Sequence, residues 1–181
     1  MQFKKLSLLA AISLSVALGL MFSSAAVAQQ APVARGKYLV NHLSHCLSCH
    51  SPIGRKGRRV PGLEMSGVPA KNADKRKGPP QNVGFPGPFG MRSYPSNLTP
   101  DKETGIGNWT EADWLNAFRK RVNPQGKKYA HTQMEWDVYR NIKDADLKAI
   151  FAYLRTMKPV KNKAPTNIAP KFPGKGGKGK H

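Results

Sequence analysis

The chain has 181 residues, and its 30 Lys and Arg against 10 Asp and Glu give a formal net charge of +20. This length suits a single domain. The charge would suit nucleic-acid binding, but the chain carries no nucleic-acid motif. Both cysteines fall in one pentapeptide, which leaves no thiol for a disulfide framework, a separate zinc site or a nucleophile.

The chain begins with a basic start, an uncharged apolar segment and a small-residue cleavage site. Two lysines precede the apolar segment 6–22, and an Ala-Val-Ala site ends at Ala28. This order predicts a cleaved secretory signal peptide over residues 1–28, and therefore a periplasmic mature protein with a net charge of +18. A retained membrane anchor is the alternative, because the apolar stretch is nearly long enough to span a bilayer.

The first predicted helix runs from about Ala34 into the cysteine pentapeptide. Its apolar residues recur at helical spacing: Tyr38, Leu39, Leu43, Cys46 and Leu47. Gly36 lies near its start, where the missing side chain would let another helix cross closely.

The pentapeptide Cys46-Leu47-Ser48-Cys49-His50 is a C-x-x-C-H motif, the signature of covalent haem attachment. Two thiols at this spacing can form thioethers to the two vinyl groups on one haem edge. The histidine that follows can then ligate the iron as the proximal ligand. The motif therefore predicts one haem c held by Cys46, Cys49 and His50.

Two other chemistries use a C-x-x-C pair. A thioredoxin-like redox motif needs a βαβ context, and no such context surrounds this pair. A zinc site needs two more Cys or His ligands, and His42 and His45 would crowd one short helix. We interpret both histidines as exposed helix residues, with His45 close enough to Cys46 to affect the electrostatics of the haem edge.

Residues Ser51 to Pro100 are predicted to be irregular, because Pro and Gly recur throughout the segment. A loop this long is often functional, and a bound haem would give it a core to wrap. The expected inward anchors are Phe85, Phe89, Met91, Tyr94 and Leu98. A basic surface insertion is expected at about 55–80.

The second predicted helix begins at a Thr110–Asp113 capping box, and Trp109 before it can pack on Trp114 as a staple. Its apolar stripe is Trp114, Leu115, Phe118 and Val122. The last predicted helix spans about Asp144 to Met157, with a buried face of Leu147, Ile150, Phe151, Leu154 and Met157. The haem domain should then cover 29–162, and the Pro-, Gly- and Lys-rich segment 163–181 should be a disordered basic tail.

The residues alone leave the sixth iron ligand open. The candidates are Met65, Met91, Met134, Met157 and His131. Met134 leads, because a loop between the second and last helices can fold over the distal haem face. Met157 fits a helix core better, and His131 fits an exposed loop better.

Beyond these features, the chain resembles a class I c-type cytochrome, in particular the monohaem domains found with bacterial periplasmic dehydrogenases. The matching segments are 35–40 before the C-x-x-C-H motif, 96–101, 103–107 with Trp109, Met134 with Trp136, 139–141 and 147–155. The resemblance implies an all-α fold of few helices wrapped around one covalently bound haem, with long irregular loops. It also implies that the first and last helices cross, with Gly36 and Tyr38 facing the last helix.

The resemblance further implies iron ligation by His50 and Met134. The family usually has proline on both sides of this methionine, where this chain has Gln133 and Glu135. It usually begins the last helix with a Ser or Thr cap, where this chain has Lys143, so Asp144 is the expected cap.

The sequence therefore predicts a periplasmic electron carrier, not an enzyme, whose haem iron cycles between Fe(III) and Fe(II). A fixed cytochrome subunit of a periplasmic dehydrogenase complex is the alternative. A haem enzyme or ligand sensor with a labile distal site is a third, weaker one. The expected partners are redox proteins with acidic docking surfaces and no nucleic acid, with weak contact to anionic lipid headgroups as a further option.

Overall fold

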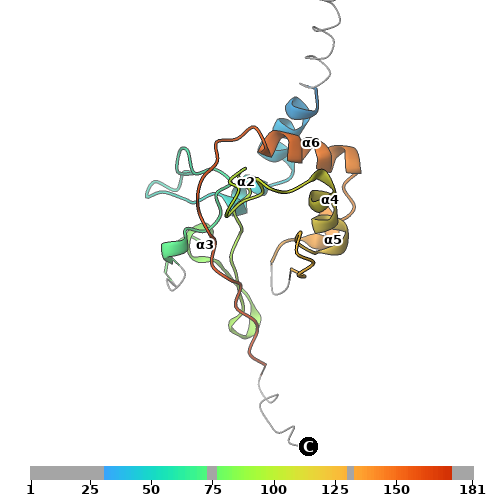
Figure 1. Ribbon diagram of the computed structural model, residues 1–181. Helices are drawn as coiled ribbons and strands as arrows, with labels where there is room; N and C mark the ends of the chain where they lie inside the picture. The colour runs from blue at the N-terminus through green and yellow to red at the C-terminus, as the bar shows by residue number, and fades with distance from the viewer. Residues whose placement is uncertain (1–30, 73–76, 130–132, 173–181) are drawn as a thin grey trace, which may run out of the picture.

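The computed structural model describes residues 31–72, 77–129 and 133–172. Its longer helices gather on one side, and an irregular region with one short helix and a small hairpin lies on the other (Figure 1). The elements in chain order are a helix over residues 31–38 continued by the π-helix η1 (Leu39–Leu43), α2 (Cys46–His50), η2 (Ala70–Asn72), α3 (Pro80–Val83), β1 (Phe85–Pro86), η3 (Pro88–Gly90), β2 (Arg92–Ser93), α4 (Glu111–Lys120), α5 (Trp136–Tyr139) and α6 (Asp144–Leu154). No helix within the described ranges has the length and apolar character needed to cross a bilayer. The expected signal peptide, residues 1–28, lies outside the described residues.

The first helix does not run unbroken into the cysteine motif, as the periodicity predicted. It widens into η1, and the backbone and hydroxyl of Ser44 both bond back to the carbonyl of Leu39. His45 then adopts a left-handed conformation (φ 52°), which a right-handed helix cannot continue. The chain therefore turns before α2 and presents the motif on a separate short helix.

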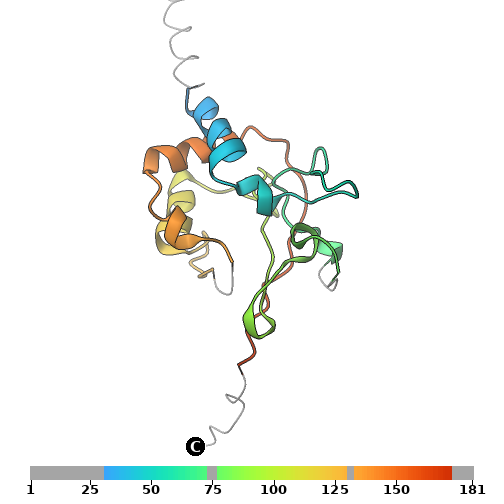
Figure 2. The same cartoon turned by 180° about the vertical axis from the view of Figure 1, so that it is seen from behind.

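The predicted crossing of the first and last helices is present, and it depends on Gly36. A Cβ on Gly36 would overlap the carbonyl oxygen of Ala149 and lie 2.8 Å from Cβ of Tyr153. Figure 2 shows the first helix lying across α6 at this point. Tyr38, expected in the same contact, is instead half exposed and lies against the ring of His42.

Helix α4 begins as the sequence predicted. The Thr110 hydroxyl accepts from the backbone N–H of Asp113, and the Asp113 carboxylate accepts from the backbone N–H of Thr110. The rings of Trp109 and Trp114 lie 6.4 Å apart, as the staple requires. The helix ends at Lys120, because Arg121 is left-handed (φ 56°), so Val122 falls outside the predicted stripe.

The N-cap of helix α6 lies one residue before the expected one. Lys143 has extended backbone angles at the cap position and makes no side-chain cap bond, whereas Asp144 is already helical. The prediction of Asp144 as the cap is therefore wrong. Its carboxylate instead accepts a hydrogen bond from Arg119, and its charge still favours the helix N-terminus. The helix stops at Leu154, and Met157 follows in a turn.

The hydrophobic core lies between the first helix, α4 and α6. Its buried members include Val40, Trp114, Phe118, Leu147, Ile150 and Leu154. The indole N–H of Trp114 donates to the backbone carbonyl of Leu147 at 2.8 Å, which connects α4 to α6. Trp114 and Phe118 of this core also line the cavity described in the next section.

The region between α2 and α4 is largely irregular, as predicted, but it is not free of strands. β1 and β2 form a two-stranded antiparallel sheet with Phe85 opposite Ser93, so the described part of the fold is helical with one small sheet rather than all-α. Tyr94 is buried as expected, whereas Phe89 is 54% exposed and is not an inward anchor. At the start of the expected basic insertion, Arg59 pairs with Ile53 just before it, and exposed basic residues lie between them.

Residues 159–172, here named the C-terminal strap, run from α6 past α2 and then alongside the β1–β2 hairpin (Figures 1 and 2). Ile168 exchanges two backbone hydrogen bonds with Arg92 of β2. Residues 163–172 therefore differ from the predicted disordered tail, because edge pairing gives their backbone partners that composition does not reveal. Residues 173–181 lie outside the described part.

Candidate haem site

A cavity of about 610 Å³ opens between α2, α4, α5, the loop 93–109 and the C-terminal strap. Its walls are mostly apolar, with Trp109, Trp114, Phe118 and Tyr129 among the larger side chains. A recess of about 40 Å³ shares His50 and Met134 with it and adds Cys46. The size of the cavity lies in the usual range for cofactor sites, about 300–1,000 Å³.

Both cysteines of α2 reach this space as free thiols. The Cys46 sulfur lies 3.0 Å from the Ser44 hydroxyl, and burial raises the pKa of its thiol. Burial also raises the pKa of the Cys49 thiol, with a smaller contribution from the charge of Glu135. Neither thiol is therefore tuned as a nucleophile, which suits cysteines whose role is a structural covalent bond.

His50 lies at the end of α2 and is buried. Its Nδ1 lies 2.8 Å from the carbonyl oxygen of Ser96, so Nδ1 donates and Nε2 keeps its lone pair. Burial lowers the pKa of the imidazole, which favours the neutral ring. A fixed neutral imidazole with one nitrogen bonded to a backbone carbonyl is the usual form of a metal-ligating histidine.

Met134 lines both the cavity and its recess, on the short segment that enters α5. Gln133, which stands where the family usually has a proline, is fixed by hydrogen bonds. Its backbone N–H donates to the Ser93 hydroxyl at 3.1 Å, and its side-chain amide donates to the carbonyl of Pro86. These two bonds hold the segment against the small sheet, and they restrain it where a proline ring would otherwise do so.

The other expected candidates for the sixth ligand lie elsewhere. Met65 is fully buried in the core, and neither Met91 nor Met157 lines the cavity. Met134 is the one methionine lining the cavity among the described residues. His131 lies outside the described part, and His45 lies at the cavity rim before α2.

The donor set fits a covalent haem better than the other chemistries of a C-x-x-C pair. No group of three His, Cys, Asp or Glu side chains that could hold a metal ion occurs in the described ranges, which leaves the zinc interpretation without ligands. The one sheet in those ranges is an antiparallel hairpin, so a thioredoxin-like βαβ unit is missing there too. The indole N–H of Trp136, a cavity residue, is buried without a partner, and an acceptor on a bound group would satisfy it.

Several cavity residues could not be found from the motif. Tyr139 donates its hydroxyl to the carbonyl of Ser44, and burial raises the pKa of Tyr139 to about 12. Lys163 and Asn167 of the C-terminal strap also line the cavity. The only sequence signal for Tyr139 was its place in a segment of family resemblance, and the strap residues carried no signal.

The comparisons with known proteins agree with this geometry. The family model described as Cytochrome c matches residues 33–158. The chain belongs to the cytochrome c family. Its cofactor is one covalently bound haem c at the C-x-x-C-H motif, and its role is electron transfer.

Curated relatives extend the comparison to the cytochrome subunits of dehydrogenases. The chain is 31% identical over 160 residues to the "Alcohol dehydrogenase (quinone), cytochrome c subunit" of Gluconobacter oxydans, covering 84% of this chain and 28% of that protein. It is 30% identical over 149 residues to the "Fructose dehydrogenase cytochrome subunit" of Gluconobacter japonicus, covering 82% and 26%. It is 32% identical over 126 residues to the "Gluconate 2-dehydrogenase cytochrome c subunit" of Pantoea cypripedii, covering 70% and 23%. The chain thus spans less than a third of the length of each of these relatives.

Proposed function

We propose that this cytochrome c is a periplasmic electron carrier, not a catalyst, whose iron is held by His50 and Met134. The observation that carries the proposal is that both side chains line one cavity from different elements, with the two thiols at its edge. Bound haem supplies the one-electron Fe(III)/Fe(II) couple. An iron with two protein ligands has no open position for a substrate, which suits a carrier.

Different residues of the chain would hold different parts of the haem. Cys46 and Cys49 fix one edge covalently, and the bond to Ser96 orients the His50 ring. Met134 would supply a thioether sulfur, which favours the reduced state and raises the potential. The aromatic walls from α4 exclude water and lower the local dielectric.

The test compares Met134→Ala with Met157→Ala, a methionine that packs on the core outside the cavity. The oxidised wild-type holoprotein should show a sulfur-to-iron charge-transfer band in the near infrared. Met134→Ala should lose that band, and Met157→Ala should keep it. A high-spin wild-type spectrum, or a band unaffected by Met134→Ala, would contradict the ligation and favour an open distal site.

We further propose that partner proteins dock through an acidic surface at the basic hairpin 53–60. Arg55, Lys56, Arg58 and Arg59 are exposed there, and the Arg59 guanidinium donates to the carbonyl of Leu47 within the haem motif at 3.4 Å. The hairpin therefore places positive charge beside the edge through which electrons would leave. Charge steering of this kind speeds encounter and weakens with salt.

Docking is tested by removing two charges at the hairpin and two elsewhere. Arg55→Gln/Arg58→Gln should slow reduction by an acidic redox protein about tenfold or more at low salt and flatten the salt dependence. Lys37→Gln/Lys120→Gln removes the same charge from exposed sites on the helices and should have a smaller effect. Equal slowing by both pairs would show that net charge acts without a docking site. If Arg55→Gln/Arg58→Gln instead reduces binding to anionic lipid vesicles, the result would favour the anionic membrane surface as the partner of the hairpin.

A fixed subunit of a dehydrogenase complex is the second candidate, and the names of the relatives favour it. Stable co-purification with a dehydrogenase in high salt would support this candidate. A monomer that separates from its reductant under those conditions would support the free carrier.

A further inference from the structure

The C-terminal strap forms part of the cavity wall. Lys163, Ala164, Pro165 and Asn167 all line the cavity, and all four lie beyond residues 33–158, which the family model matches. This wall is therefore an addition to the part of the chain that the family pattern covers. It raises the question of what the added residues contact when haem is bound.

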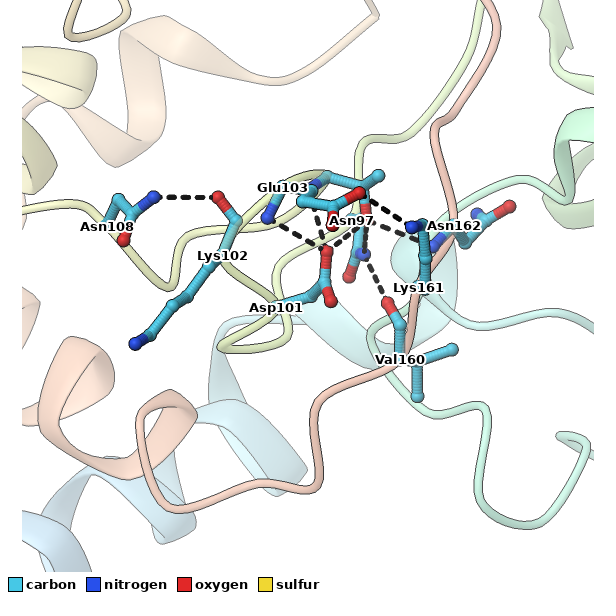
Figure 3. A network of polar contacts seen from close by, with 9 residues as sticks. Asn97, Asp101, Lys102, Glu103, Asn108, Val160, Lys161 and Asn162 are labelled. Carbon is cyan, nitrogen blue, oxygen red and sulfur yellow. Dashed lines mark hydrogen bonds and ion pairs between the residues drawn. The ribbon is translucent and has the colours of Figure 1, made fainter.

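The upper part of the strap is held by amide side chains. Asn162 donates its side-chain N–H groups to the carbonyls of Ser66 and Val68 at 2.7 and 2.9 Å, and its backbone N–H donates to Thr104 at 3.0 Å. Asn97 donates to the carbonyl of Val160 at 2.7 Å. Figure 3 shows Val160, Lys161 and Asn162 facing the loop that carries Asn97 and Glu103. The backbone that leads directly into Lys163 is thus fixed.

The lower part is held against the hairpin. The backbone N–H of Tyr94 donates to the side-chain oxygen of Asn167 at 2.7 Å, and Ile168 pairs with Arg92 of β2. The rings of Phe172 and Phe89 lie 5.0 Å apart, which explains why Phe89 is not turned inward. With both ends anchored, the segment that contains Lys163 has a defined place at the cavity.

The recess and the wide cavity have chemically different linings. Cys46 lines only the recess, and Cys49 lines both spaces, so the thioethers would form beside the recess. The strap residues line the wide cavity but not the recess. The two carboxylates of a haem lie on the edge opposite its vinyl groups, so they extend away from the cysteines.

The lining of the wide cavity carries one basic and one acidic side chain. Lys163 is the one Lys or Arg that lines the cavity within the described residues, and Glu135 is the one acid. Glu135 acts electrostatically on Cys49 and Tyr139, which places its charge near the thioether end. The other titratable lining groups are His45, His50, Cys49, Tyr94, Tyr129 and Tyr139. Among these, burial raises the pKa of Tyr129 to about 12, so it stays neutral near neutral pH.

We propose that Lys163 is the counter-ion of a haem propionate and that the C-terminal strap exists in this chain to position it. Lys163 lines the cavity and is itself exposed to solvent, and an ammonium beside a carboxylate there forms a charge-assisted hydrogen bond. The inference rests on the haem c assignment and is independent of whether Met134 ligates the iron. Lys163 is a positioning residue for the cofactor edge, with no part in any bond-making step.

The test is a redox titration of the holoprotein as a function of pH, with Lys163→Gln, Lys163→Arg and Lys171→Gln. Lys171→Gln is the matched control, because it removes the same charge from the same strap at a site that does not line the cavity. A propionate paired with a cation titrates at lower pH than an unpaired one, by about 1–3 units. The pH-dependent step in the midpoint potential should therefore move up by about one unit in Lys163→Gln, the lower end of that range because Lys163 is exposed. Above that step, the potential of Lys163→Gln should lie below that of the wild type, because the variant lacks a positive charge that favours the reduced iron.

Lys163→Arg should restore the wild-type step, and Lys171→Gln should match the wild type. Equal behaviour of Lys163→Gln and Lys171→Gln would overturn the proposal, as would a change in potential with no movement of the step or no step in any variant. The near-infrared spectrum of each variant reports iron ligation separately. A charge-transfer band absent from the wild type would mark failure of the Met134 assignment, while the position of the step alone decides the role of Lys163.

Discussion

The helical side of the molecule and the irregular side are held by different interactions. In the helical side, Trp114, Leu147 and Ile150 pack as buried apolar side chains, and the helices satisfy their own backbone. In the irregular side, Asn97 and Asn162 use side-chain amides to satisfy backbone groups far away in sequence. A segment without regular structure must find partners for its backbone, and short amide side chains supply them. Substitutions should therefore lower the free energy of unfolding mainly through lost packing on the helical side. On the irregular side they should lower it mainly through lost hydrogen bonds.

The largest expected effect is at the centre of the helical core. Leu147 is fully buried, so Leu147→Ala should lower the free energy of unfolding by about 2–5 kcal/mol. Leu43→Ala, at a half-exposed leucine, is the control and should cost far less. Denaturant unfolding of the holoprotein measures both, and equal losses would contradict the assignment of the core.

The helix crossing should be almost as sensitive. Gly36→Ala forces a Cβ into the backbone of Ala149, so we expect a loss of about 3 kcal/mol, the upper end for overpacking. Ala34→Val adds bulk at an exposed position of the same helix, and it should lower the free energy of unfolding much less than Gly36→Ala does. Thermal unfolding compares them, and a neutral Gly36→Ala would show that the helices do not cross closely.

On the irregular side, the sharpest test is Asn162→Ala. It leaves the carbonyls of Ser66 and Val68 without their amide donor, which should cost about 1–3 kcal/mol. Hydrogen exchange should increase in the strap and the loop around Ser66 and leave α4 and α6 protected. Asn108→Ala removes one bond at an exposed site and is the control. Uniform loss of protection throughout the chain would contradict the division into two regions.

The smallest expected effect is at the N-terminus of α4, where Thr110→Ala removes the capping hydroxyl and should cost about 1 kcal/mol. The Thr110 hydroxyl and N–H lower the pKa of the Asp113 carboxyl. Such a group stabilises the fold above its ordinary pKa, and this contribution is lost as the pH falls through the lowered value. The difference between the denaturant midpoints of wild type and variant should therefore be larger at pH 7 than below about pH 3, where only the bond from the Asp113 N–H to the Thr110 hydroxyl is left to lose. A constant difference over this range would exclude the carboxylate from the cap.

Local sequence predicted the features that depend on neighbouring residues. The capping box at Thr110 is confirmed, and so is the α6 stripe except for Met157, which lies beyond the end of the helix. The crossing at Gly36, which the family resemblance implied, is also confirmed. The break before α2 was missed, because apolar spacing continues across Ser44 while a left-handed His45 ends the helix. Asp144 was assigned as a cap from its residue type, but its backbone had already turned helical and its carboxylate contacts Arg119.

The sequence by itself determined the chemistry of the site, because the spacing of Cys46, Cys49 and His50 is set by the haem they bind. Only the tertiary structure decided which distant groups complete the cavity. It brings Met134 to the same space as His50, and it lays the strap with Lys163 along the wide part of the cavity, outside the recess. The strap is placed by hydrogen bonds from Asn97 and Asn162 across long sequence separations, and local periodicity carries no information about such bonds.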